Sequence, residues 1–209
     1  MADGEKNYVM NIALALILIA TAGLLVYATK DWFLTESQKT VQMSSTTSFA
    51  SFDESIMKNG MASKANIGNL GSQHIHADFK VFVNGHSIDF AENKYYMKSG
   101  FLHLDDNQNK QDASGVLHIH ATGVPLWIFF RSIGMDFNKD CITLETQQKF
   151  CNDGNKKLKF FINGKENNDF ENYVFKDLDK ILISYGDENE EQIRNQLNSI
   201  TNFASLHSK

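Results

Sequence analysis

The chain of 209 residues has only one proline, two tryptophans and two cysteines. Two cysteines are too few for a disulfide-dense scaffold, although they suffice for one covalent link. A single proline leaves few rigid turns, and sixteen phenylalanines predict a core packed largely with Phe rings. Hydrophobic residues at 42% and charged residues at 22% are globular values, which argue against wholesale disorder.

Acidic residues outnumber basic ones, with 25 Asp and Glu and 20 Lys and Arg, which gives a formal net charge of -5. Without a basic stripe, nothing in the sequence favours binding to nucleic acid. The chain has no Gly-x-Ser-x-Gly, no phosphate-binding Gly-rich loop and no His-Glu-x-x-His. The sequence therefore makes no positive case for a hydrolase or a nucleotide enzyme, and it leans against enzymatic activity.

One long hydrophobic run is present near the N-terminus. Residues Val9–Ala28 carry no charge over about 20 residues, the length that spans the hydrocarbon core of a membrane. The alternative is a cleaved signal peptide, because Ala20-Thr21-Ala22 resembles a cleavage site. The apolar run continues past that point through Leu24–Val26, which favours an uncleaved signal-anchor helix.

Four segments follow from this pattern. We expect the transmembrane helix (about 9–28) within residues 1–33, a flexible stalk at 34–72, a β-rich domain at 73–186, and an amphipathic helix and tail at 187–209. Charges on the two sides of the apolar run nearly balance, so they do not define the orientation. The cysteine pair favours the oxidising, extracytoplasmic side. The expectation is a single-pass protein of the cell membrane with its C-terminal domain outside.

Strand signals dominate the β-rich domain. Asn84-Gly85 and Asn163-Gly164 each lie between β-type patterns, and Asn-Gly is the strongest short hairpin signal. Their flanks, FKVFVNGH and LKFFINGK, echo each other, either through an internal duplication or because both are Phe-rich hairpins. One helix is expected at Pro125–Gly134, with Pro in the first turn and Gly as the terminating residue.

These elements predict an α+β fold. The strands FLHL and GVLHIH, the helix, and then CITL, LKFFI and KILISYG follow the ββαββ order of a β-grasp. In that arrangement the first hairpin, HIHADFKVFV with SIDF, is an added element. The predicted fold class is thus a transmembrane helix followed by a β-grasp-like domain with an extra hairpin.

Histidines alternate with apolar residues in three of the expected strands. Because successive side chains of a strand point to opposite faces, the polar ones share the face opposite the core. The side chains placed in this way are His74, His76 and Asp78 on the first strand, His103 with Asp105 on the second, and His118 with His120 on the third. If the three strands are neighbours, these imidazoles and carboxylates project from one face.

Imidazole and carboxylate are ligands of zinc and of divalent copper. The alternative is a solvated sheet face that merely carries polar residues. Two His-x-His pairs close to a His-x-Asp pair strengthen the metal interpretation. We therefore predict a copper or zinc site at His74, His76, His118 and His120, with His103 and Asp78 as weaker candidates. Catalysis would also need an open coordination position and a general base, which the pattern does not indicate.

Cys141 and Cys151 flank the segment CITLETQQKFC, which is typical of two short strands about a turn. Antiparallel strands folded there bring the cysteines opposite each other, so a structural disulfide is expected outside the cell. The alternatives are two free thiols or a redox-active pair, and the absence of Cys-x-x-Cys argues against the latter.

From His74 to about Phe203, the order HIHADFKVFVNG, FLHLDD, GVLHIHATGVPL, CITLETQQKFCNDG, LKFFINGK and ILISYGDENEEQI resembles a family of single-anchor extracytoplasmic proteins of ammonia-oxidising archaea. Bacterial relatives of that family typically show His-Thr-His-Asp where this chain has His103-Leu104-Asp105-Asp106. Some members are labelled protein-disulfide isomerase, a label that the missing Cys-x-x-Cys does not support. The copper-dependent metabolism of that lineage makes copper the first metal to test, by analogy.

Three functions follow as hypotheses. The first is a membrane-anchored, extracytoplasmic domain that binds copper or zinc. The second is a structural or accessory subunit of a membrane protein complex, with its histidines merely on a solvated face. The third is a thiol-disulfide exchange protein that uses Cys141 and Cys151.

Overall fold

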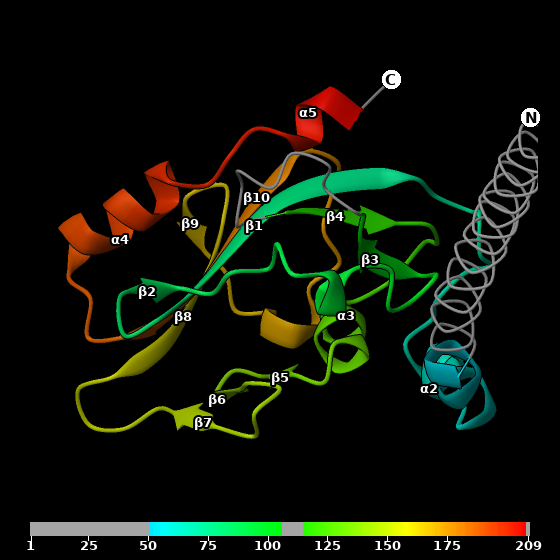
Figure 1. Cartoon of the computed structure of the whole chain (residues 1–209), viewed down its shortest axis with the longest axis horizontal. Coiled ribbons are helices and arrows are strands. Elements are labelled where there is room, and N and C mark those ends of the chain that lie inside the picture. Colours follow the sequence, from blue (N-terminus) through cyan, green and yellow to red (C-terminus); the bar gives the residue numbers. More distant parts are fainter. Residues whose placement is uncertain (1–50, 106–114, 208–209) are drawn as a thin grey trace, which may run out of the picture. The chain divides into compact units, whose positions relative to one another are not determined.

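The computed structural model describes residues 51–105 and 115–207. Most strands join one large mixed sheet in the order β3-β4-β1-β10-β8-β9, with β2 paired to β1 (Figure 1). Its strands are β1 (Ile75–Val83), β2 (His86–Ser87), β3 (Leu102–Leu104), β4 (Val116–Ile119), β8 (Lys157–Ile162), β9 (Lys165–Glu166) and β10 (Asp179–Gly186). A small second sheet contains β5 (Asp136–Phe137), β6 (Cys141–Thr143) and β7 (Lys149–Cys151).

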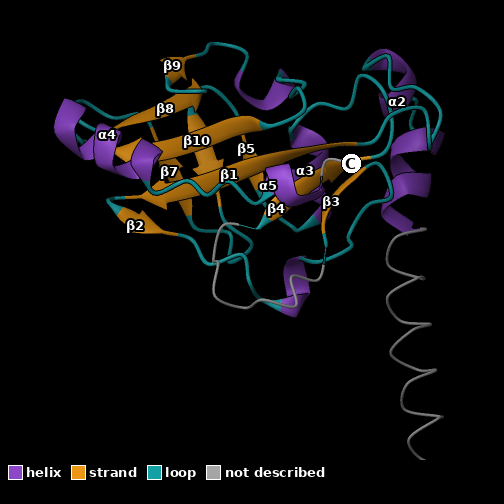
Figure 2. Cartoon of the chain, turned by 90° about the horizontal axis from the view of Figure 1, so that it is seen from above, coloured by secondary structure: helices purple, strands orange, loops and turns teal. Residues whose placement is uncertain are grey.

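Within the described residues, 51–58 are helical, and four further helices are short. These are α2 (Met61–Lys64), α3 (Trp127–Ser132), α4 (Glu190–Asn198) and α5 (Ala204–His207), with 3-10 turns η1 (Asn93–Tyr95) and η2 (Phe170–Asn172). Figure 1 shows α4 and α5 on one side of the large sheet, and α3 with the small sheet on the other. Figure 2, seen from above, agrees, because α4 and α5 lie in front of the strands.

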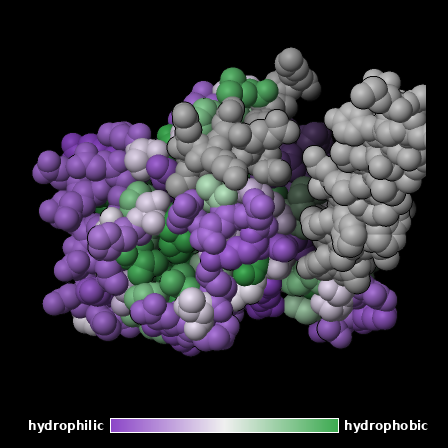
Figure 3. Space-filling view, in the orientation of Figure 1, coloured by the Kyte–Doolittle hydropathy of each residue, from purple (hydrophilic) through white to green (hydrophobic). Residues whose placement is uncertain are grey.

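The centre of the sheet is a parallel pair, with Phe79 of β1 opposite Ile181 of β10. Both side chains are buried in the main core, which they share with α3 and the small sheet. On the other face, Phe82 and Leu182 form a smaller core with residues of α4 and the segment that follows it. Both sheet faces are therefore packed, and the central strands carry apolar residues on each side. In Figure 3, hydrophilic residues cover most of the described face, and hydrophobic residues show in the middle of that face and at its top.

The predicted fold class requires correction. The structure is an α+β fold with a mixed sheet, and in its described part no helix is long and apolar enough to cross a membrane. The transmembrane helix expected at 9–28 lies outside the described residues.

The strand order also differs from the predicted β-grasp with an added hairpin. The expected opening strand, FLHL, is the edge strand β3, whereas β1 lies beside β10 at the centre. The strand CITL belongs to the small sheet as β6. Local patterns identify strands but carry no information about distant neighbours, and the parallel partners β1 and β10 are about a hundred residues apart in the sequence.

Several local predictions are confirmed. Asn84-Gly85 and Asn163-Gly164 form hairpins between β1 and β2 and between β8 and β9, with all four residues at positive φ. Helix α3 lies within the predicted range 125–134.

Residues 51–72, which were expected in the stalk, pack on the domain instead. Ile56 is buried in the core. The two carboxylate oxygens of Asp53 accept hydrogen bonds from the Ser99 hydroxyl and the Gly100 amide.

Candidate metal centre

Three neighbouring strands bring the histidines together. His76 of β1 is directly opposite His118 of β4, and His118 is directly opposite His103 of β3. His74 and His120 come one pleat further on, at the ends of β1 and β4, because Ile75 is opposite Ile119. The three histidine strands are thus neighbours, a condition that the sequence left open.

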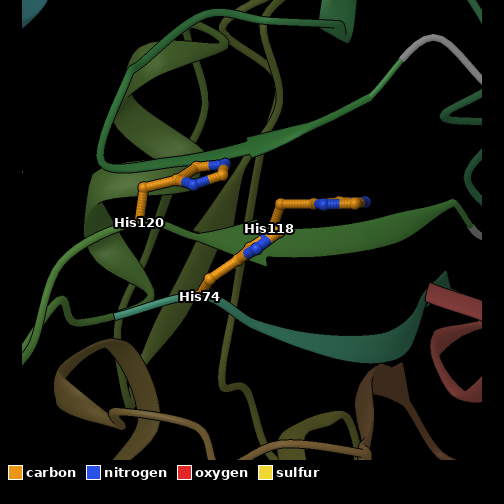
Figure 4. Close-up of side chains that lie close together, drawn as sticks. All are labelled: His74, His118 and His120. Atoms are coloured by element: carbon orange, nitrogen blue, oxygen red, sulfur yellow. The ribbon is translucent and has the colours of Figure 1, made fainter. Parts of the chain in front are cut away.

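His74, His118 and His120, here called the histidine triad, are the described residues whose geometry suits one ion. One ligand atom from each lies within 4.8 Å of the others. Figure 4 shows the three side chains rising side by side from the two neighbouring strands. Two ligands of a tetrahedral ion with bonds of about 2.0 Å lie roughly 3.3 Å apart. Modest rotations within the side-chain rotamer wells bring ligand atoms that lie up to 4.8 Å apart to this separation.

His76 and His103 extend the triad to a group of five imidazoles, called here the histidine cluster. The ring of His76 lies 4.5 Å from that of His118 and 4.7 Å from that of His74, measured between centroids. The ring of His103 stacks on that of His120, with centroids 4.9 Å apart. His118 is the middle of the cluster, with a buried imidazole on each neighbouring strand.

Burial differs across the cluster. His76, His103 and His118 are each less than 5% exposed, whereas His74 is exposed and His120 is half-buried. Solvent therefore reaches the cluster at the end where His74 and His120 lie. This arrangement gives an ion a path from water to buried nitrogen ligands.

Backbone hydrogen bonds hold the strand end that carries His120. Its amide N–H donates to the carbonyl of Phe101, and its carbonyl accepts from Gly71. Two residues further on, Thr122 accepts from the Gly68 amide and donates its own amide to Ser72 Oγ. The segment before β1 thus fixes the backbone from which His120 projects, as a preorganised site requires.

Asp105 lies against two imidazoles of the cluster. Its carboxylate oxygens are 3.1 Å from Nε2 of His103 and 3.4 Å from Nδ1 of His118. The hydrogen bond with His103, together with nearby imidazoles, lowers the pKa of Asp105 to about 2. Asp105 is therefore an ionised carboxylate at neutral pH. The sequence pattern placed it beside His103 on the strand, but we did not include it among the predicted ligands.

The environment of His120 favours its neutral form. Burial lowers the pKa of His120, and the neighbouring imidazoles of His103 and His74 lower it further. A neutral imidazole offers a lone pair, whereas a protonated one has none. Because metal ligands must be deprotonated, the site is suited to a cation at neutral pH.

Asp78, one of the weaker predicted ligands, has a different role in the structure. Its Oδ1 accepts hydrogen bonds from the Thr201 hydroxyl and the Phe203 amide, and its Oδ2 accepts from the Ala204 amide. The carboxylate therefore holds the C-terminal segment and the start of α5 on β1. It shares a strand face with His76, as predicted, but it is not among the residues that form the triad.

Sequence reasoning missed Asp177. Its Oδ1 accepts a hydrogen bond from the backbone amide of His76 at 2.9 Å and lies 3.9 Å from Nδ1 of the same residue. Next to it, Leu178 has a positive φ and donates its amide to the His76 carbonyl. Asp177 precedes β10, so only the long-range pairing of β1 with β10 brings it to His76. No local signal in the sequence could have identified it.

The predicted disulfide between Cys141 and Cys151 is present. The two residues are directly opposite each other on β6 and β7, as the antiparallel pattern required. The described part of the chain has no free cysteine. Thiolates therefore do not contribute to the candidate site, and its donors are nitrogen and oxygen atoms.

Comparisons of the chain with protein-family models, with curated proteins and with solved structures gave no match. The interpretation of the site therefore depends on its own geometry.

Proposed function

We propose that this protein binds a copper or zinc ion through the histidine triad, in an oxidising compartment outside the cytoplasm. The observation that carries the proposal is the convergence of three imidazole ligand atoms within 4.8 Å, in a cluster of five histidines. A sheet that merely needed polar surface residues would not bury three of those imidazoles.

The choice of metal follows from the donor atoms. Imidazole suits zinc and copper, and for a given site the affinity order of divalent ions places Cu²⁺ above Zn²⁺. Calcium and magnesium are disfavoured because they prefer cages of oxygen ligands. We therefore expect Cu²⁺ to bind more tightly than Zn²⁺, and Zn²⁺ far more tightly than Mg²⁺.

The compartment follows from the disulfide. Structural disulfides persist in oxidising surroundings and are rare in a reducing cytosol. The link between Cys141 and Cys151 supports an extracytoplasmic location for the domain. The same link speaks against thiol-disulfide exchange, because the cysteines lie on paired strands and are not in a Cys-x-x-Cys motif.

Calorimetric titration of the purified, metal-free full-length chain tests this proposal. We expect Cu²⁺ and Zn²⁺ to bind with dissociation constants below about 1 μM. The variant carrying both His118→Ala and His120→Ala should lose this binding. His86→Ala is the matched control, because His86 is exposed on β2 and takes no part in the cluster. Equal binding by the double variant and by wild type would overturn the proposal.

A further inference from the structure

The histidine cluster and Asp105 supply more donors than one ion uses. A tetrahedral zinc or copper ion takes about four ligands, and a catalytic zinc takes about three from the protein. The cluster has five imidazoles, and Asp105 adds a carboxylate to the two buried rings of His103 and His118. Of the donors outside the triad, His103 and Asp105 lie together on one side of His118, and His76 lies on the other.

The hydrogen bonds of His103 leave one of its nitrogens facing an anion. Nδ1 of His103 lies 2.7 Å from the carbonyl oxygen of Ser99, which can only accept, so Nδ1 carries a hydrogen and donates it. Nε2 is then the ring nitrogen left to bind an ion, and it lies 3.1 Å from Oδ1 of Asp105. An Nδ1–H bond to a backbone carbonyl is also the usual way in which a metal-binding histidine is oriented.

Asp105 offers one carboxylate oxygen to each of two rings. Its Oδ1 lies 3.1 Å from Nε2 of His103, and its Oδ2 lies 3.4 Å from Nδ1 of His118. These values match the roughly 3.3 Å expected between two ligands of a tetrahedral ion. Two imidazoles and a carboxylate also form a common ligand set of zinc sites that keep one open position.

We propose that His103, Asp105 and His118 form a second metal position beside the triad, so that the cluster holds two divalent ions of the zinc or copper type. This inference rests on the proposed function, because both positions use His118. The second position differs from the first in having a carboxylate ligand. Each position can therefore be removed without the other.

Metal content per chain tests the second position. The metal-free full-length protein is dialysed to equilibrium against Zn²⁺, and bound zinc is measured by mass spectrometry. Wild type should hold two ions, Asp105→Asn one, and the exposed control His86→Ala two. The variant with His74→Ala and His120→Ala should also retain one. Circular dichroism checks that each variant is folded.

The outcomes separate the two proposals. Two ions in wild type and one in Asp105→Asn support the second position. One ion in wild type overturns it and leaves the triad site intact, whereas no ion overturns both. Two ions in both wild type and Asp105→Asn overturn the role of Asp105. A measurement on wild type alone adds a check. Two Cu²⁺ ions bound to the two nitrogens of His118 require that the ring release its remaining N–H proton to solvent. The resulting imidazolate bridge should couple the two ions magnetically in electron paramagnetic resonance, and two independent signals would contradict the shared ligand.

Discussion

His76 and His118 are direct partners across β1 and β4, and their rings meet edge to face with centroids 4.5 Å apart. Both rings are almost completely buried. On the other side of His118, the ring of His103 is nearly parallel to it, 6.0 Å away. His118, in the middle of three strands, therefore links every part of the cluster.

Replacing His118 should cost the most metal affinity of any single substitution. His118→Ala removes a ligand of the triad and one of the nitrogens beside Asp105. Because changes in the second shell alone cost about 10- to 100-fold in affinity, we expect a loss of more than about 100-fold. Calorimetry with Zn²⁺ measures it, with His86→Ala as the control. A loss of less than tenfold would mean that His118 is not a ligand.

The metal-free protein should become less stable as the pH falls through about 6.5, the ordinary pKa of histidine. Burial lowers the pKa of His120 in the folded protein, so the unfolded chain takes up its proton first. Stability is therefore complete above the unfolded pKa and is lost as the pH drops through it. Urea unfolding at pH 7.5 and pH 5.5 measures the difference, which should be smaller for His120→Gln. An unchanged difference would show that His120 does not contribute.

Removing the disulfide should weaken the fold but not the metal site. The link joins residues ten apart in sequence, and a loop of this size stabilises a protein by about 2–3 kcal/mol. The variant with Cys141→Ser and Cys151→Ser should lose that much free energy of unfolding, measured with urea. Its affinity for Zn²⁺ should equal that of wild type, because the disulfide belongs to the small sheet and not to the histidine strands. A large loss of affinity would contradict this separation.

Asp78→Ala tests whether this carboxylate is structural. The substitution removes the acceptor for three hydrogen bonds from residues 201–204 and should cost about 1–3 kcal/mol of stability. We also expect limited proteolysis to cut the C-terminal segment faster. Zinc affinity should stay within about twofold of wild type. If affinity fell as far as it does for His118→Ala, Asp78 would be a ligand after all.

The faces that carry the candidate ligands were predictable because their signal is local, whereas the sequence left open whether the three strands are neighbours. Alternation of histidines with apolar residues around His76 and His118 defined a common face without knowledge of the fold. The disulfide was predictable for the same reason, since Cys141 and Cys151 flank a single turn. What alternation could not distinguish was the role of each polar residue on that face. Asp78 shares the strand face of His76, but its carboxylate accepts hydrogen bonds from a segment more than 120 residues away.

The sheet order was less predictable because it depends on distant pairings. The parallel contact between β1 and β10 brings Asp177 to the backbone of His76, and no property of either segment alone specifies that contact. Burial of Ile56 in the core has the same origin, because the segment around it is mostly polar and resembles a linker. The two Asn-Gly hairpins and the position of helix α3, which depend on neighbouring residues, were predicted correctly.

X-ray absorption spectroscopy of the full-length protein loaded with one equivalent of Zn²⁺ identifies the ligands of the bound ion. Binding by the histidine triad predicts nitrogen and oxygen ligands at about 2.0–2.1 Å, no sulfur at about 2.3 Å, and outer-shell scattering from at least three imidazoles. The imidazole scattering should drop in the variant with His118→Ala and His120→Ala. A spectrum with only water-like oxygen ligands, or one with sulfur in the first shell, would contradict binding by the histidine triad.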